Sequence, residues 1–230
     1  MKSIFILIIL FSSTLVFSEV QNSIQNFQVV LKDTNNQPFI FRGSQLYRKS
    51  HFDQLKNLDI EKVIIFKIEK NQEVFNEVQK LAETGLTFKN IIHIPMKWKD
   101  FESFEESCLM TKKALVELKN SYDEHIKTYF HCSAGEDRTG YLDGLFQTLI
   151  FDHSDVETVF QKRLCQFGYA HANVKKPLHV SEALQSELSL HYVVMTKKIM
   201  DLKSENKSIQ NLDCSTDEEN IKKIKPFVCQ

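Results

Sequence analysis

Short apolar runs and longer amphipathic segments alternate along most of the chain. The runs KVIIFK at 62–67 and NIIHIP at 90–95 are almost continuously apolar, as in strands that are buried on both faces. We therefore expect strands at 27–31, 38–41, 62–67, 90–95 and 127–131, and helices at 50–58, 71–85, 101–120, 139–151, 155–166 and 179–203. Strands that alternate with helices predict a single α/β domain, with a mostly parallel four- or five-stranded sheet flanked by helices. Ser50 and Asn71 are the expected caps of the first two helices.

The two ends of the chain differ from this pattern. Residues 4–17 are almost wholly apolar, follow the single charge of Lys2 and lead to a cleavage site at 16–18. An apolar run of about 14 residues is short for a membrane span and typical of a secretory signal. We expect a signal peptide at 1–18, an exported mature protein that is periplasmic or secreted, and no stable membrane insertion after cleavage. The domain that carries the candidate chemistry is expected at 25–205, followed by a polar tail at 206–230.

Composition narrows the class of partner. The chain has 230 residues, 42% of them hydrophobic and 26% charged, with a formal net charge of −1. These values are typical of a folded soluble domain. Because nucleic-acid binding usually needs a basic surface, the charge balance argues against a nucleic-acid partner.

Five cysteines fit an oxidising destination, and their odd number indicates one special thiol. Cys214 and Cys229 both lie in the tail, and we expect them to form a disulfide. Cys108 shares a helical face with apolar residues, so we expect it to be a buried core thiol. Cys165 has no assigned state. The remaining cysteine is Cys132, and its candidate role follows from the residues around it.

The candidate chemistry lies at 131–140, HCSAGEDRTG, between an expected strand and an expected helix. A loop in this position can aim successive backbone N–H groups at an anion, aided by the positive end of the following helix. Arg138 can bind two phosphoryl oxygens. The positive potential of the loop, the helix end and Arg138 also favours the thiolate form of Cys132, which attacks phosphorus. Thr139 would hydrogen-bond the sulfur, and His131 would orient the loop. The residues expected to surround the phosphate are Ser133, Ala134, Gly135, Glu136 and Asp137.

These residues resemble the signature of the protein tyrosine phosphatase superfamily, HCxxGxxR followed by Ser or Thr. The resemblance covers about residues 38–200, and the segment 41–45 is similar to the opening segment of dual-specificity-like members. In its length and its expected secretion, the chain is similar to members of the bacterial branch that includes tyrosine-phosphatase-like phytases. Those enzymes remove phosphates from inositol polyphosphates. The resemblance implies two-step phosphomonoester hydrolysis without metal or cofactor. Those phytases carry basic pockets, whereas Glu136 and Asp137 are acidic, so their charge is expected to repel additional phosphates.

The resemblance also implies a general acid from a loop that carries Trp and Asp. Here Trp98 and Asp100 match, with Lys99 where the family often has Pro, and Asp100 precedes Cys132 by 32 residues. Two other readings stay open: Asp100 caps the helix from 101, or Asp137 is the acid, as in some bacterial relatives. The cations that could contact further substrate phosphates, or simply be surface charges, are Lys97, Lys99, Arg42, Lys175 and Lys176.

The leading substrate hypothesis is a soluble inositol phosphate, and the alternative is phosphotyrosine on a protein. A rhodanese-like sulfurtransferase would also use a loop cysteine, but Asp100 and the pair Arg138-Thr139 argue against it. A phosphate-binding module without turnover is the non-enzymatic alternative, and the intact Cys132 argues against that.

Overall fold

The sheet has the order β1-β2-β5-β3-β4, with β1 antiparallel to β2 and the other pairs parallel. Its strands are β1 (Gln28–Lys32), β2 (Pro38–Gly43), β3 (Lys62–Phe66), β4 (Ile91–Ile94) and β5 (Thr128–His131). The computed structural model describes residues 23–101, 103–152, 155–215, 221 and 223–230. The five-stranded, mostly parallel sheet confirms the predicted α/β class. The expected signal peptide at 1–18 lies outside the described residues.

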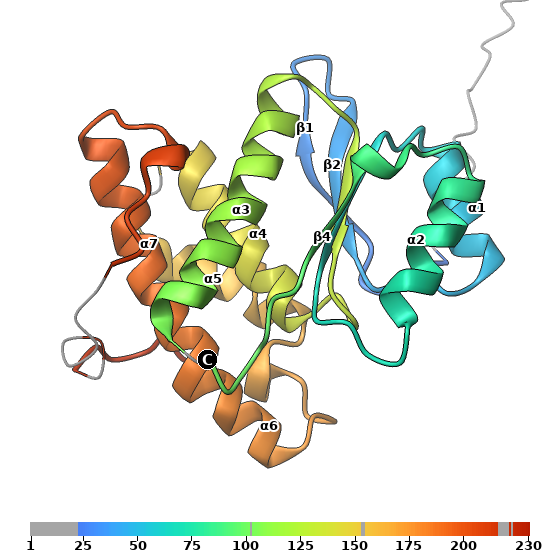
Figure 1. Cartoon of the computed structure of the whole chain (residues 1–230). Coiled ribbons are helices and arrows are strands. Elements are labelled where there is room, and N and C mark those ends of the chain that lie inside the picture. The colour runs from blue at the N-terminus through green and yellow to red at the C-terminus, as the bar shows by residue number, and fades with distance from the viewer. Residues whose placement is uncertain (1–22, 102, 153–154, 216–220, 222) are drawn as a thin grey trace, which may run out of the picture.

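Helices cover both faces of the sheet (Figure 1). On one face lie α1 (Lys49–Asn57) and α2 (Glu73–Glu83), which pack against the sheet through residues such as Leu55, Val74 and Leu81. The other layer contains α3 (Phe104–Asp123), α4 (Asp137–Ile150), α5 (Val156–Arg163), α6 (Leu178–Ala183) and α7 (Ser189–Ser204). All residues of α4 from Arg138 to Leu149 are buried, so this helix is the centre of its layer.

The central strands bring the candidate chemistry to the middle of one sheet edge. β5 lies between β2 and β3, with His131 opposite Gly43 on one side and Ile65 on the other. Every residue of β3 and β5 is buried, which explains the almost continuous apolar run of β3. The 131–140 loop, called the phosphate loop below, therefore begins at the carboxyl end of an interior strand, where ligands bind in such sheets.

The expected helix caps Ser50 and Asn71 are wrong, and so is the alternative interpretation of Asp100 as a cap. The caps are Arg48 for α1, Gln72 for α2 and Ser103 for α3, and only Ser103 uses its side chain, accepting a hydrogen bond from Glu106 N at 3.1 Å. Asn71 and Asp100 instead have positive φ angles of 52° and end the preceding turns. Asn and Asp tolerate this left-handed conformation, so the same residue types suit a turn as well as a cap.

The end of the chain returns to the main core. The helical path from α6 to α7 runs through a π-helical turn, η4 (Leu184–Leu188), and a short 3-10 helix, η5 (Ile209–Asn211), follows. Ile209, Leu212 and Cys214 are buried in the core cluster, and Lys112 of α3 donates to the Leu212 carbonyl at 2.8 Å. The described part of the tail is therefore packed against the domain between α3 and α7.

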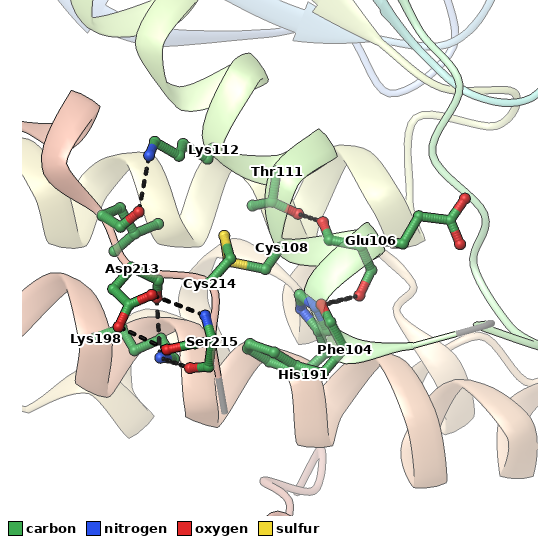
Figure 2. Close-up of a disulfide and its surroundings, with 12 residues drawn as sticks. Phe104, Glu106, Cys108, Thr111, Lys112, His191, Lys198, Asp213, Cys214 and Ser215 are labelled. Atoms are coloured by element: carbon green, nitrogen blue, oxygen red, sulfur yellow. Dashed lines mark hydrogen bonds between the residues drawn. A yellow bond between two sulfur atoms is a disulfide. The ribbon is translucent and has the colours of Figure 1, made fainter. Parts of the chain in front are cut away.

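The predicted Cys214–Cys229 disulfide is wrong. Cys214 is bonded to Cys108 of α3, and Cys229 to Cys165. Figure 2 shows the first bridge joining α3 to the tail, with Lys198 of α7 donating to the tail backbone beside it. The prediction paired cysteines that are close in sequence, whereas the apolar residues of the tail carry Cys214 to the core. Cys108 is buried as expected, but it is not a thiol.

In the part of the chain that the structure describes, no helix combines the length and the apolar character that crossing a membrane requires.

Candidate active site

The phosphate loop leaves β5 and enters α4 at Asp137. Cys132, its second residue, is 3% exposed and is the one cysteine outside the two disulfides. The chain thus keeps a single thiol, and it lies at the start of this loop. The N-terminus of α4 follows within five residues, so its positive end is directed at the same region.

The carbonyl groups of the loop are held outward. Four consecutive carbonyl oxygens accept hydrogen bonds from surrounding groups: Cys132 O from His131 Nδ1 (2.8 Å), Ser133 O from Gln45 N (2.9 Å), Ala134 O from Asn26 Nδ2 (2.9 Å) and Gly135 O from Arg42 Nη2 (2.8 Å). No peptide bond of the described residues is cis. A trans peptide points its N–H opposite to its C=O, so the N–H groups of residues 133–136 face the other side. Successive N–H groups on one side form an anion-binding nest.

Gly135 is required by the path of the loop. Its φ angle is +76°, and a Cβ there would lie 2.5 Å from the carbonyl carbon and oxygen of Gly43. The loop backbone thus contacts the end of β2 directly. Any side chain would both strain the backbone and push the loop away from the strand.

Arg138 and Thr139 face the loop from the first turn of α4. Arg138 is 7% exposed, and its guanidinium donates to Met96 O at 2.9 Å and to Ser133 Oγ at 3.3 Å. The Thr139 hydroxyl oxygen accepts from Cys132 N at 2.8 Å. The structure therefore brings Arg138, Ser133 and Thr139 together around Cys132. This hydrogen bond of Thr139 is with the backbone of Cys132 rather than with its sulfur.

Arg42 is an internal support of the loop and not a surface cation. Its side chain is fully buried and pairs with Asp143 of α4 at 2.9 Å, while it also donates to Gly135 O and Arg163 O. The hypothesis that Arg42 contacts substrate phosphates is therefore wrong. Its two terminal nitrogens donate within the protein, where they join β2, α4 and the phosphate loop, whereas Nε has no hydrogen-bond partner among the described residues.

Lys176 pairs with both acidic residues of the loop. Its ammonium lies 3.3 Å from Glu136 Oε2 and 2.5 Å from Asp137 Oδ1, and its side chain is 8% exposed. Asn173 also donates to Glu136, and Ala170 N donates to Asp137. The expectation that Glu136 repels substrate phosphates treated its charge as unpaired. In the structure Glu136 is paired with Lys176, which offsets part of that repulsion. Lys176 is equally not available as a surface phosphate ligand.

Burial raises the pKa of Asp137, opposed by its contacts with Lys176 and the Ala170 amide. The carboxyl group is held by the Ala170 amide and the Lys176 ammonium. It is directed at the 168–176 segment, which includes the 3-10 helix η3 (Ala170–Ala172).

The Trp98–Asp100 segment begins next to Arg138, because Met96 accepts from that guanidinium. Trp98 packs partly buried against the main core, and Lys99 lies over its ring at 5.3 Å. The Asp100 side chain is 76% exposed and pairs with Lys99 at 3.3 Å. Asp100 is therefore neither the cap of α3 nor in contact with the phosphate loop in this structure. Lys97 and Lys99 lie in the same segment.

Several supporting residues escaped the sequence analysis. They are Asn26 and Gln45, which hold loop carbonyls, Asp143, which pairs with Arg42, and Glu77 of α2, whose Oε1 lies 3.3 Å from His131 Nε2. A signal existed for two of them. Glu77 lies on the apolar face of α2 between Val74 and Leu81, and Asp143 lies within the apolar run of α4. A carboxylate at a core position indicates a buried partner.

Comparisons with known proteins gave fold-level matches. No protein-family model and no curated protein sequence matches the chain. The chain is similar to the core catalytic domain of the PP-IP phosphatase SIW14 from S. cerevisiae, with 20% identity, a TM-score of 0.49 and coverage of 80% of this chain and 93% of that chain. It is also similar to Tk-PTP in its active form (13%, 0.48, 72% and 93%) and to PTPMT1 (15%, 0.47, 73% and 95%).

Proposed function

We propose that the protein is a cysteine-dependent phosphatase of the protein tyrosine phosphatase superfamily, which hydrolyses phosphomonoesters without a metal. One observation carries this proposal: four consecutive carbonyls of the phosphate loop are held outward next to the only thiol of the chain. The loop is therefore already shaped to bind a dianion beside a nucleophile. Preorganised N–H groups stabilise developing charge without reorganisation during the reaction.

Substrate binding places the phosphoryl group in the loop. The N–H groups of residues 133–136 and the N-terminus of α4 bind its oxygens, and Arg138 turns from Met96 O and Ser133 Oγ to bind two of them. The phosphorus then faces Cys132 in line with the leaving oxygen.

In the first step the Cys132 thiolate attacks phosphorus. A sulfur–phosphorus bond forms, the ester oxygen–phosphorus bond breaks, and the leaving oxygen takes a proton from a general acid. Asp100 is the better candidate for this acid because Asp137 is held by Lys176 and the Ala170 amide. Since Asp100 is exposed in this structure, its segment must move inward over the bound substrate.

In the second step water attacks the cysteinyl phosphate. The oxygen–phosphorus bond forms, the sulfur–phosphorus bond breaks, and Asp100 accepts the proton of the water. The Thr139 hydroxyl, which already accepts from Cys132 N, stabilises the departing thiolate as a donor. Inorganic phosphate then leaves the loop.

The substrate that we propose is a soluble inositol phosphate. Lys97 and Lys99 support this choice because they lie on the segment that leads from Met96, next to Arg138. Since Arg42 and Lys176 are engaged inside the protein, we expect a ring that carries few phosphates.

A panel of phosphoesters tests the proposal. The purified mature protein should release phosphate from inositol phosphates and from an aryl phosphate, and Cys132→Ser should be inactive while it keeps its fold. Ser215→Ala, which changes an exposed hydroxyl far along the tail, is the matched control and should keep full activity. Substantial turnover by Cys132→Ser would exclude the thiolate mechanism. Preference for a phosphotyrosine peptide over every inositol phosphate would replace the proposed substrate.

A further inference from the structure

Glu77 is a carboxyl group buried behind the phosphate loop. It lies on α2 and is 2% exposed, and its Oε1 accepts from Leu46 N at 2.7 Å. The same oxygen lies 3.3 Å from Nε2 of His131, which is fully buried. A carboxyl group is not retained in such a position unless it has partners.

The hydrogen bond on the far side of the His131 ring defines which nitrogen can titrate. Nδ1 lies 2.8 Å from the Cys132 carbonyl, and a carbonyl only accepts, so Nδ1 carries a proton. Nε2 is then the nitrogen that gains or loses one. Among the described residues it has no hydrogen-bond partner, and Oε1 of Glu77 lies 3.3 Å from it.

Burial makes the two groups share one proton. Burial raises the pKa of Glu77 to about 8 and lowers the pKa of His131 to about 4. The charges that face Glu77 are Lys67 and Lys80, which lower its pKa, and Glu73, which raises it; Lys67 and Arg138 lower the pKa of His131. The Tyr129 ring stacks on His131 at 5.4 Å. Between about pH 4 and about pH 8 the two groups together therefore hold one titratable proton, named the shared proton here, and the pair is neutral.

Glu77 supports two of the four outward carbonyls. Through His131 it holds the ring that donates to Cys132 O, and through Leu46 N it holds the segment whose preceding residue, Gln45, donates to Ser133 O. These are the two carbonyls next to the thiol. Loss of the shared proton would place a carboxylate against the Nε2 lone pair and add a negative charge behind the thiolate.

We propose that Glu77 is a positioning residue that acts through His131, holding the start of the phosphate loop in its anion-binding shape and releasing it when the shared proton is lost. This inference rests on the proposed role of Cys132 as the nucleophile. It predicts that the reactivity of the site declines on the alkaline side through Glu77, a group that touches neither the substrate nor the sulfur.

Histidine ring NMR and thiol alkylation test the coupling together. Protein labelled with ¹⁵N-histidine is titrated from about pH 5 to about pH 9.5, with the His131 signals assigned from His131→Asn. The rate of Cys132 alkylation by iodoacetamide and kcat/KM for p-nitrophenyl phosphate are measured over the same range. The variants are Glu77→Gln, which keeps the shape of the side chain, and Glu83→Gln as the control, because Glu83 is exposed at the end of the same helix.

In the wild type and in Glu83→Gln, the His131 signals should shift near pH 8, with an inflection of the alkylation rate at the same pH. The His131 shift and the alkylation inflection should both be absent in Glu77→Gln. The alkaline decrease of kcat/KM should be about tenfold smaller in this variant than in the wild type. A His131 ring that does not titrate in this range in the wild type would overturn the proposal, even if Glu77→Gln does not fold. An unchanged alkylation inflection in Glu77→Gln would also overturn it. If the His131 signals shift as expected but neither the wild type nor the variants hydrolyse a phosphoester, the proposed function is rejected instead.

Discussion

The buried pair Arg42–Asp143 gives the sharpest test of how the loop is supported. Both side chains are 0% exposed and lie 2.9 Å apart. At an effective dielectric constant of about 20, two unit charges at this distance attract by roughly 6 kcal/mol, and desolvation offsets much of this. Removal of Asp143 leaves the buried Arg42 charge without a carboxylate, and removal of Arg42 leaves Asp143 with only the more distant Arg163, at 4.0 Å; a change of this kind costs about 3–5 kcal/mol. We therefore expect Asp143→Ala and Arg42→Met each to lower the free energy of unfolding by about that amount.

A double-mutant cycle separates the pair from its surroundings. Urea unfolding of Arg42→Met, Asp143→Ala and the double variant gives the coupling energy, and kcat/KM for an aryl phosphate is measured on the same samples. The double variant should cost at least about 2 kcal/mol less than the sum of the single variants, because the second change removes the charge that the first left unpaired. Arg42→Met should also lose activity, since Gly135 O loses its donor. Single effects that add within about 0.5 kcal/mol would refute the reasoning.

Other residues give independent predictions. Gly135→Ala should lower the free energy of unfolding, because its Cβ would meet the Gly43 carbonyl. It should also lower kcat/KM by more than about tenfold, and normal kinetics in that variant would contradict the loop path. Cys214→Ser should lower the urea midpoint by the equivalent of about 4–5 kcal/mol on the chain-entropy model, since the Cys108–Cys214 bridge joins residues 106 apart; peptide mapping that finds Cys214 bonded to Cys229 would instead restore the local pairing. Asp100→Asn should reduce turnover of an inositol phosphate much more than that of p-nitrophenyl phosphate, whose leaving oxygen needs little protonation, and the reverse pattern in Asp137→Asn would identify Asp137 as the acid.

The sheet and the position of the loop could be predicted because they depend on local patterns. The strand β3 is buried on both faces, so its apolar run is almost continuous, and β5 ends directly at the loop. Gly135 could be singled out for the same reason, since a tight bend needs glycine wherever the rest of the chain lies.

Features that depend on distant partners could not be predicted. Arg42 and Lys176 look like surface cations in the sequence, but Asp143 lies 101 residues from Arg42, and Glu136 lies 40 residues from Lys176. The disulfides likewise join cysteines that only the folded core brings together. Asp100 shows a different limit, because an Asp can end one turn or cap the next helix, and only its left-handed backbone distinguishes the two.

The central claim is that Cys132 carries the phosphoryl group during turnover. Wild-type protein is mixed with an aryl phosphate, quenched in acid during steady-state turnover, digested and analysed by mass spectrometry of the peptide that contains Cys132. The account predicts a phosphoryl group on Cys132, which accumulates in the presence of substrate and is absent in Cys132→Ser. Turnover without any phosphoryl group on Cys132, or with one on another residue, would contradict it.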